Sequence, residues 1–169
     1  MPNLQRPHYF NGRLLTAADF QAEQDYLRDR HRRHLRRMHG MGVVSGLQVT
    51  VEGRGTGTRV TVSPGFAVDA VGNEIELESP VTVPVAASAG RLWVELRHGE
   101  RRTGAIPAGL GTALGDVQSA WVEEFADVAL VESATAGMVY PGQGVPLARL
   151  LFTRGGWRLD RRHRVPRAR

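Results

Sequence analysis

Hydrophobic and polar residues follow two different periods along this chain, and the first is helical. Residues 16–39 contain no Gly or Pro, and their apolar positions recur at helical spacing. Thr16 is a good N-cap, and Asp19 three residues later completes a capping-box pattern. Gly40 is a natural residue to follow the last turn. The pattern predicts one helix that begins at Thr16 and ends at His39.

The apolar face of this helix is thin. Steps of four and three residues from Phe20 give a heptad-like seam with polar residues in its middle. Two arrangements suit such a seam: it packs on the protein's own sheet with the arginine face in water, or it lines the axis of an oligomer. The first is the simpler interpretation. The seam consists of Phe20, Gln24, Leu27, His31, His34 and Met38.

From Met41 onward the apolar residues alternate with period two, which is typical of strands. Pro84 indicates that its strand lies at a sheet edge. Residues 103–116, rich in Gly and Ala, predict a long loop, and the tail 161–169 has no apolar period and is expected to be loose. The predicted strands are 43–51, 59–62, 66–69, 74–77, 81–85, 91–97, 117–131, 145–152 and 157–159, with hairpins across 70–73 and 153–156.

These elements predict a mainly β (α+β) fold, in which an arginine-rich N-terminal helix precedes an antiparallel β-sandwich-like domain. The expected divisions are residues 1–40 for the N-terminal segment and helix, 41–160 for the β domain and 161–169 for the basic tail. A chain of 169 residues, 41% of them hydrophobic, is long enough for one buried core.

The amino-acid composition limits the kinds of site and partner that this chain can have. The sequence has no Cys, which excludes disulfides, and no apolar run long enough to predict membrane insertion. All 22 basic residues are arginine, and the formal net charge is +5. Arginines crowd the helix and the C-terminus, which predicts an acidic partner, either nucleic acid or an acidic stretch of a neighbouring subunit. The expected partner surface on the helix is Arg28, Arg32, Arg33, Arg36 and Arg37.

No catalytic, cofactor or metal site is predicted. His31, His34 and His39 cluster on the helix, but no His-Glu-x-x-His pattern accompanies them. Acidic residues at 69–78 surround a predicted turn, and we interpret them as a solvated strand face and not as the paired carboxylates of a glycoside hydrolase. Nucleic-acid binding is the serious alternative function, although Tyr26 is the only aromatic residue within the arginine cluster. A carbohydrate-active enzyme is the weaker alternative.

The N-terminal third carries a more specific pattern. It reads Tyr-Phe-x-Gly-x-Leu-Leu-Thr-x-x-Asp-Phe, then Glu-Gln-x-Tyr, His-Gly-x-Gly-Val-Val-x-Gly-Leu and Pro-Gly-x-Ala-x-Asp-x-x-Gly. This order resembles a family of phage-tail-like proteins, found among baseplate and fibre-attachment components of contractile phages and bacterial contractile injection systems. The motif residues are Tyr9, Phe10, Gly12, Leu15, Asp19, Phe20, His39, Gly40, Gly42, Gly46, Pro64, Gly65 and Asp69.

The resemblance implies a structural role without catalysis: assembly within a baseplate, fibre attachment or an adaptor between neighbours. It implies other tail or baseplate subunits as partners and a homo-oligomer, for example a trimer. We expect synthesis and assembly in the cytoplasm and a final location in a phage-like particle, which can be extracellular. Locally, we expect Tyr9 and Phe10 to staple the start of the helix to the β core, and Gly40, Gly42 and Gly46 to allow sharp turns and close backbone approach.

Overall fold

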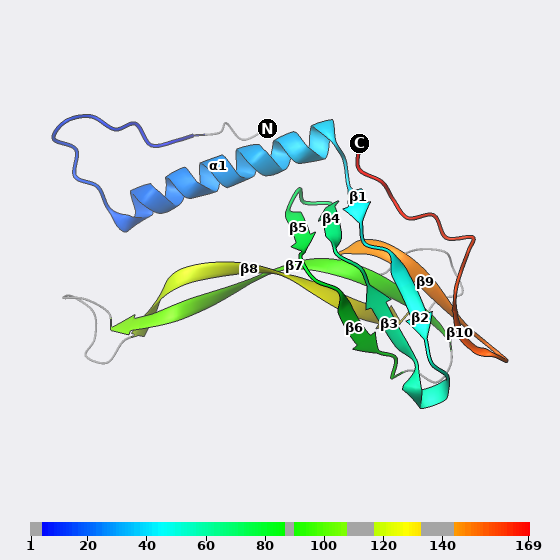
Figure 1. Ribbon diagram of the computed structural model, residues 1–169. Helices are drawn as coiled ribbons and strands as arrows, with labels where there is room; N and C mark the ends of the chain where they lie inside the picture. Colours follow the sequence, from blue (N-terminus) through cyan, green and yellow to red (C-terminus); the bar gives the residue numbers. More distant parts are fainter. Residues whose placement is uncertain (1–4, 87–89, 108–116, 133–143) are drawn as a thin grey trace.

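The computed structural model describes residues 5–86, 90–107, 117–132 and 144–169 (Figure 1). These form one N-terminal helix followed by strands, so the predicted mainly β class is confirmed. The elements are α1 (Ala17–Met38), β1 (Gly42–Gly46), β2 (Val49–Glu52), a 3-10 turn (Gly55–Gly57), β3 (Arg59–Val62), β4 (Gly65–Val68), β5 (Glu74–Leu77), β6 (Val81–Pro84), β7 (Arg91–Pro107), β8 (Val117–Glu132), β9 (Val145–Thr153) and β10 (Gly156–Leu159).

Both predicted ends of helix α1 are confirmed to within one residue. The Thr16 hydroxyl accepts a hydrogen bond from the backbone N–H of Asp19, and the Asp19 carboxylate accepts one from the backbone N–H of Thr16. At the other end the N–H groups of His39 and Gly40 both donate to the Leu35 carbonyl, and Gly40 has φ +74°. Among the described residues, no helix combines the length and apolarity needed to cross a membrane.

The described strands make three antiparallel sheets, which confirms the antiparallel prediction. Their orders are β1-β4-β5, β2-β3-β6 and β10-β9-β7-β8. The predicted hairpins β4–β5 and β9–β10 are present, and β6, which contains Pro84, lies at a sheet edge as expected. Figure 1 shows the sheets gathered into one body, from which α1 and part of the β7–β8 pair project to the same side.

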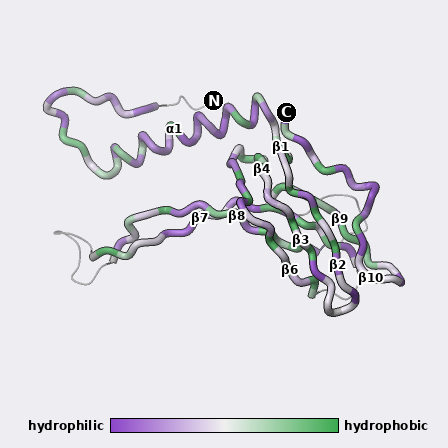
Figure 2. Tube along the Cα trace, in the orientation of Figure 1, coloured by the Kyte–Doolittle hydropathy of each residue, from purple (hydrophilic) through white to green (hydrophobic). Residues whose placement is uncertain are grey.

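The core lies inside this body and follows the period-two pattern. Val60 and Val62 on β3, Ile75 on β5, Leu96 on β7 and Leu150 on β9 are almost completely buried. Hydrophobic colouring is concentrated among the packed strands, whereas the tube of α1 is mainly hydrophilic (Figure 2). Burial of apolar area, the main driving force of folding, is therefore located in the β body and hardly at all along the helix.

Strand β7 is much longer than predicted, whereas β8 has the predicted bounds to within one residue. The two strands pair continuously from Leu92 with Glu132 to Pro107 with Val117. The predicted strand 91–97 stops ten residues too early, and the predicted loop 103–116 is wrong for 103–107, while 108–116 lie outside the described residues. Beyond the body the arm is largely exposed, so the outer part of β7 carries no hydrophobic alternation and the Gly- and Ala-rich sequence from 103 suggested a loop.

The basic tail is held against the body, which corrects the expectation that it is loose. Arg167 forms a parallel bridge with Val43 on β1, whose N–H donates to the Pro166 carbonyl at 2.9 Å. The Arg169 N–H donates to the His39 carbonyl at 2.9 Å. The tail is tied by backbone hydrogen bonds, which require no apolar period, and this explains why the sequence pattern missed it.

Candidate assembly surfaces

Helix α1 leaves most of its apolar seam in water. Only Leu35 is buried, whereas Phe20 is 52% exposed, and Leu27 and Met38 are exposed still further. The simpler interpretation, in which the seam packs on the protein's own sheet, therefore does not describe this chain. The helix and the β7–β8 arm diverge from the body as two projections (Figure 1).

The segment before the helix contacts the helix itself. The Tyr9 hydroxyl donates to the Glu23 carboxylate at 3.0 Å, and Phe10 and Leu15 are exposed. The expected staple between Tyr9, Phe10 and the β core is therefore wrong. Gly12 adopts φ +90° at the turn that reverses the chain, with nothing near the position that a Cβ would occupy. This segment adds apolar side chains to the projecting surface.

The motif residues after the helix lie where helix, strand and tail meet. A Cβ on Gly42 would come within 2.6 Å of the Pro166 backbone, so β1 and the tail approach at a distance that only glycine allows. The His39 ring contacts the Arg169 carbonyl, and the His39 carbonyl accepts from the same residue. His39, Gly40 and Gly42 therefore connect the end of α1 to the C-terminus.

Two further motif segments contact each other through glycine. Gly46 has φ +60°, and a Cβ there would clash with the Pro64 carbonyl and lie 2.8 Å from the Gly65 Cα. A Cβ on Gly65 would in turn clash with the backbone of residues 45–47. The Leu47 N–H donates to the Pro64 carbonyl at 3.1 Å. This contact fixes β1 against the start of β4.

Asp69 organises the turn on which the helix rests. Its buried carboxylate accepts hydrogen bonds from the N–H groups of Val71, Gly72 and Asn73 at 2.8–2.9 Å. A Cβ on Gly72 would clash with the backbone of Arg32 in α1. The last motif segment thus holds a hairpin turn against the inner half of the helix.

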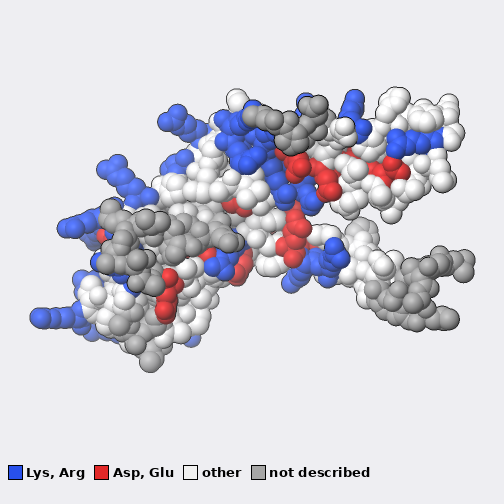
Figure 3. Space-filling model, turned by 180° about the vertical axis from the view of Figure 1, so that it is seen from behind, with Lys and Arg blue, Asp and Glu red and all other residues white. Residues whose placement is uncertain are grey.

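The helix arginines divide into two groups. Arg28 and Arg32 lie 3.5 and 3.7 Å from the Glu100 carboxylate on β7, so their charge ties the helix to the arm. Arg33, Arg36 and Arg37 form no ion pair within the part of the chain that the structure describes. Viewed from behind, blue arginine atoms crowd the helix and red acidic atoms lie where helix and arm approach (Figure 3).

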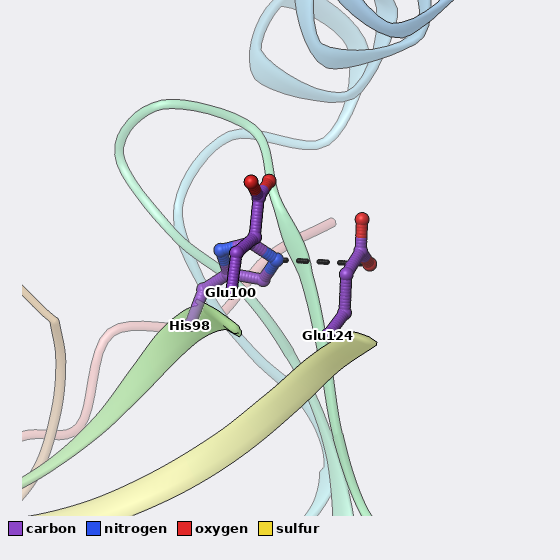
Figure 4. Close-up of side chains that lie close together, drawn as sticks. All are labelled: His98, Glu100 and Glu124. Carbon is purple, nitrogen blue, oxygen red and sulfur yellow. Dashed lines mark ion pairs between the residues drawn. The ribbon is translucent and has the colours of Figure 1, made fainter. Parts of the chain in front are cut away.

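The same junction holds a cluster that sequence reasoning missed. Glu100 and Glu124 are directly opposite in the β7–β8 register, and His98 lies 3.6 Å from Glu124 (Figure 4). One ligand atom from each of the three residues lies within 4.8 Å of the others, and these are donor types that a divalent metal accepts. Only knowledge of the strand register brings the three residues together.

The positively charged neighbours of this cluster determine whether it can bind a metal ion or act as an acid. Like charges directly opposite in a sheet are destabilising, and Arg28 and Arg32 offset the charge of Glu100 while His98 faces Glu124. A metal ion would have to compete with two guanidinium groups for Glu100. Both carboxylates are also exposed, which is not the apolar setting that a general acid needs. The cluster serves best as an electrostatic joint between helix and arm.

Acidification should loosen the start of α1. Hydrogen bonds from the Thr16 hydroxyl and backbone N–H hold the pKa of Asp19 below its ordinary value of 3.8, and Arg13 acts in the same direction. The stabilisation is present above the unfolded-state pKa and is lost as the pH falls through the lower folded-state pKa. We expect amide exchange at residues 17–20, corrected for intrinsic rates, to accelerate below pH 3.8 in the native chain.

The Asp19→Asn variant should show this faster exchange already at neutral pH. Asp29→Asn is the matched control, because the Asp29 carboxylate is exposed on the same helix and forms no ion pair or hydrogen bond with the described part of the chain. Equal exchange in the two variants would contradict the role of Asp19.

Comparison with known proteins identifies the fold. No protein-family profile matches the sequence, and no curated protein does. A chain of the type VI secretion system TssK–TssF–TssG baseplate subcomplex, determined by cryo-electron microscopy, superimposes with a TM-score of 0.58 at 15% identity, covering 96% of this chain and 62% of that one. A chain of the baseplate complex from the type VI secretion system gives 0.54 at 14%, covering 98% and 60%.

The crystal structure of TssK gives a TM-score of 0.52 at 14% identity, covering 94% of this chain and 41% of TssK. The chain therefore spans less than two thirds of the length of each of these structures. At such identities the likeness concerns the fold, which nearly the whole chain shares with proteins of a secretion-system baseplate.

Proposed function

We propose that this chain is a structural component of a contractile injection system or phage-like tail, where it acts by protein–protein assembly in the baseplate. The observation that carries the proposal is the fold match over 94–98% of the chain to baseplate structures. The proposed partners are other baseplate subunits and further copies of this chain. The specific role, as fibre attachment or as adaptor, belongs to the same proposal and follows from the N-terminal motifs.

The two projections support an assembly role. Trp121 on the arm is 72% exposed, and Val122 and Ile106 are exposed near it. Large apolar side chains concentrated on exposed elements are typical of contact surfaces, and tryptophan is enriched among the residues that dominate binding energy. Together with Phe20 and Leu27 on the helix, they give the chain two apolar surfaces that a monomer leaves in water.

Light scattering of the purified chain at low and high salt, with and without a DNA duplex, tests the proposal. We expect a discrete oligomer whose mass changes with neither salt nor DNA, because its contacts are apolar. Leu27→Ser should shift the mass toward the monomer. Val71→Ser, which also removes an exposed apolar side chain but from the Asp69 turn, should leave the mass unchanged.

A monomer that binds the duplex at low salt and releases it at high salt would overturn the proposal in favour of a nucleic-acid-binding module. A monomer that ignores DNA would remove the homo-oligomer from the proposal and leave the role of adaptor beside a different subunit.

A further inference from the structure

A basic hollow of about 660 Å³ lies on the side of the body where the tail leaves β10. Arg91 from β7 and Arg149 from β9 line it, together with Arg162 and Arg164 from the tail. These positions are distant in sequence, and the fold brings them to one place. The volume is within the range of pockets that bind small molecules or a few side chains of another protein.

The hollow has an excess of positive charge. Asp160 is the one acidic residue among the described residues that line it, and its carboxylate accepts from Arg149 Nε at 2.7 Å and from the Arg162 backbone N–H at 3.0 Å. The charge of Asp160 is thus already offset by Arg149. The exposed guanidinium groups of Arg162 and Arg164 form no ion pair with any described residue.

His163 adds a polar wall without adding charge at neutral pH. Burial, and then the nearby Arg149, lower the pKa of His163 below its ordinary value of 6.5, so its ring is neutral at pH 7. Its Nε2 is buried and has no hydrogen-bond partner in the described part of the chain.

The aromatic residue of the hollow argues against a nucleic-acid ligand. Trp93 is buried, the His163 ring packs against it in a T-shaped arrangement at a centroid distance of 4.8 Å, and the Arg149 guanidinium lies over it at 5.6 Å. The ring therefore has no free face on which a base could stack, and base stacking supplies much of single-strand binding. The arginines also converge on one hollow instead of following a backbone track. Guanidinium groups pair with carboxylates and phosphates alike, so the covered tryptophan and the converging arginines are what favour a carboxylate ligand.

We propose that this basic hollow binds an acidic segment of another polypeptide, whose Asp or Glu carboxylates pair with Arg162 and Arg164. The inference deepens the proposed assembly function and rests on it for the source of the segment, a neighbouring baseplate subunit. The tail that supplies both arginines also hydrogen-bonds to β1 and to the end of α1. Binding of the acidic segment would therefore stabilise the tail in its position against β1 and the end of α1.

Fluorescence anisotropy with a labelled oligoglutamate peptide, measured on the full chain, tests the inference. We expect Arg162→Glu/Arg164→Glu to weaken binding at least about tenfold at low salt. Arg54→Glu/Arg59→Glu is the matched control, because it makes the same change in net charge at exposed positions around the turn between β2 and β3, outside the hollow. The control should bind the peptide within about twofold of the native chain.

Two further double variants distinguish a loss of peptide binding from a loss of folding. Arg162→Lys/Arg164→Lys keeps the charge and should bind measurably, whereas Arg162→Gln/Arg164→Gln should lose binding with an unchanged circular dichroism spectrum. Equal weakening by the Arg162→Glu/Arg164→Glu and Arg54→Glu/Arg59→Glu variants would overturn the inference, since binding would then follow net charge alone. A single-stranded oligonucleotide of equal charge that binds more tightly, and depends on the same two arginines, would also overturn it.

This test separates the hollow from the proposed assembly of copies. Peptide binding does not require the oligomer, and the oligomeric mass of the Arg162→Glu/Arg164→Glu variant can be read by light scattering. Lost peptide binding with an intact oligomer supports the hollow as a separate site. A native chain that forms the oligomer but does not bind the peptide overturns the hollow and leaves the proposed function in place.

Discussion

Alanine at Gly46 is expected to lower the free energy of unfolding by about 3 kcal/mol or more. Two costs combine at this position. An alanine must adopt φ +60°, which L-residues with a Cβ rarely do. Its Cβ must also enter space occupied by the Pro64 carbonyl and the Gly65 Cα, which are backbone atoms that cannot rotate away. Urea unfolding followed by circular dichroism measures the loss.

Gly40→Ala separates the two costs. Gly40 has φ +74°, and nothing lies within 4 Å of the position its Cβ would take. This variant should therefore show the conformational cost alone, about 1 kcal/mol. Equal losses at Gly46 and Gly40 would mean that the contact between β1 and the start of β4 relaxes without cost, contrary to the geometry.

The role of these glycines was predictable from the sequence, but their contacts were not. The motif pattern selected Gly40, Gly42 and Gly46 for sharp turns and close backbone approach, and the structure places Gly42 and Gly46 against a neighbouring backbone, whereas nothing lies near Gly40. What each one touches was not predictable, because Pro166 lies more than a hundred residues from Gly42. The capping box at Thr16 was predictable in full, since all its atoms lie within one turn.

The surfaces were harder to predict than the core. A period of two signals a strand only where one face is buried, so the body strands were found and the exposed outer part of β7 was not. The Glu100–Glu124 cluster combines residues of the consecutive strands β7 and β8, and the basic hollow combines residues of β7, β9 and the tail. Both depend on strand register and on the path of the tail, which no local pattern records.

Arg97→Ala is expected to destabilise the body by about 3 kcal/mol. Glu95 on β7 is fully buried, and its carboxylate pairs with the Arg97 guanidinium and lies 3.4 Å from the Gly144 N–H. Alternation in β7 would turn Glu95 away from the core that holds Leu96, yet both faces of the strand are covered here. Removing Arg97 leaves a buried carboxylate without its counter-charge, which is far more costly than losing an exposed ion pair.

Arg101→Ala is the matched control for this prediction. Arg101 lies on the same strand and forms a bidentate pair with Glu123, with Nε and Nη2 at 2.9 and 2.7 Å from the two carboxylate oxygens. Both partners are exposed, so water solvates the Glu123 carboxylate that remains, and the free energy of unfolding should fall by less than about 1 kcal/mol. We therefore expect Arg101→Ala to destabilise the protein less than Arg97→Ala, although the Arg101–Glu123 pair is bidentate, because Glu95 is buried and Glu123 is not.

The double variant Glu95→Gln/Arg97→Ala tests the cause directly. If the cost of Arg97→Ala comes from an uncompensated buried charge, neutralising Glu95 should restore most of the lost stability, because an amide is far cheaper to bury than a carboxylate. If the double variant is no more stable than Arg97→Ala, the loss comes from the packing of the arginine side chain instead. Urea unfolding of the four proteins in this cycle decides between charge and packing as the source of stability at this position.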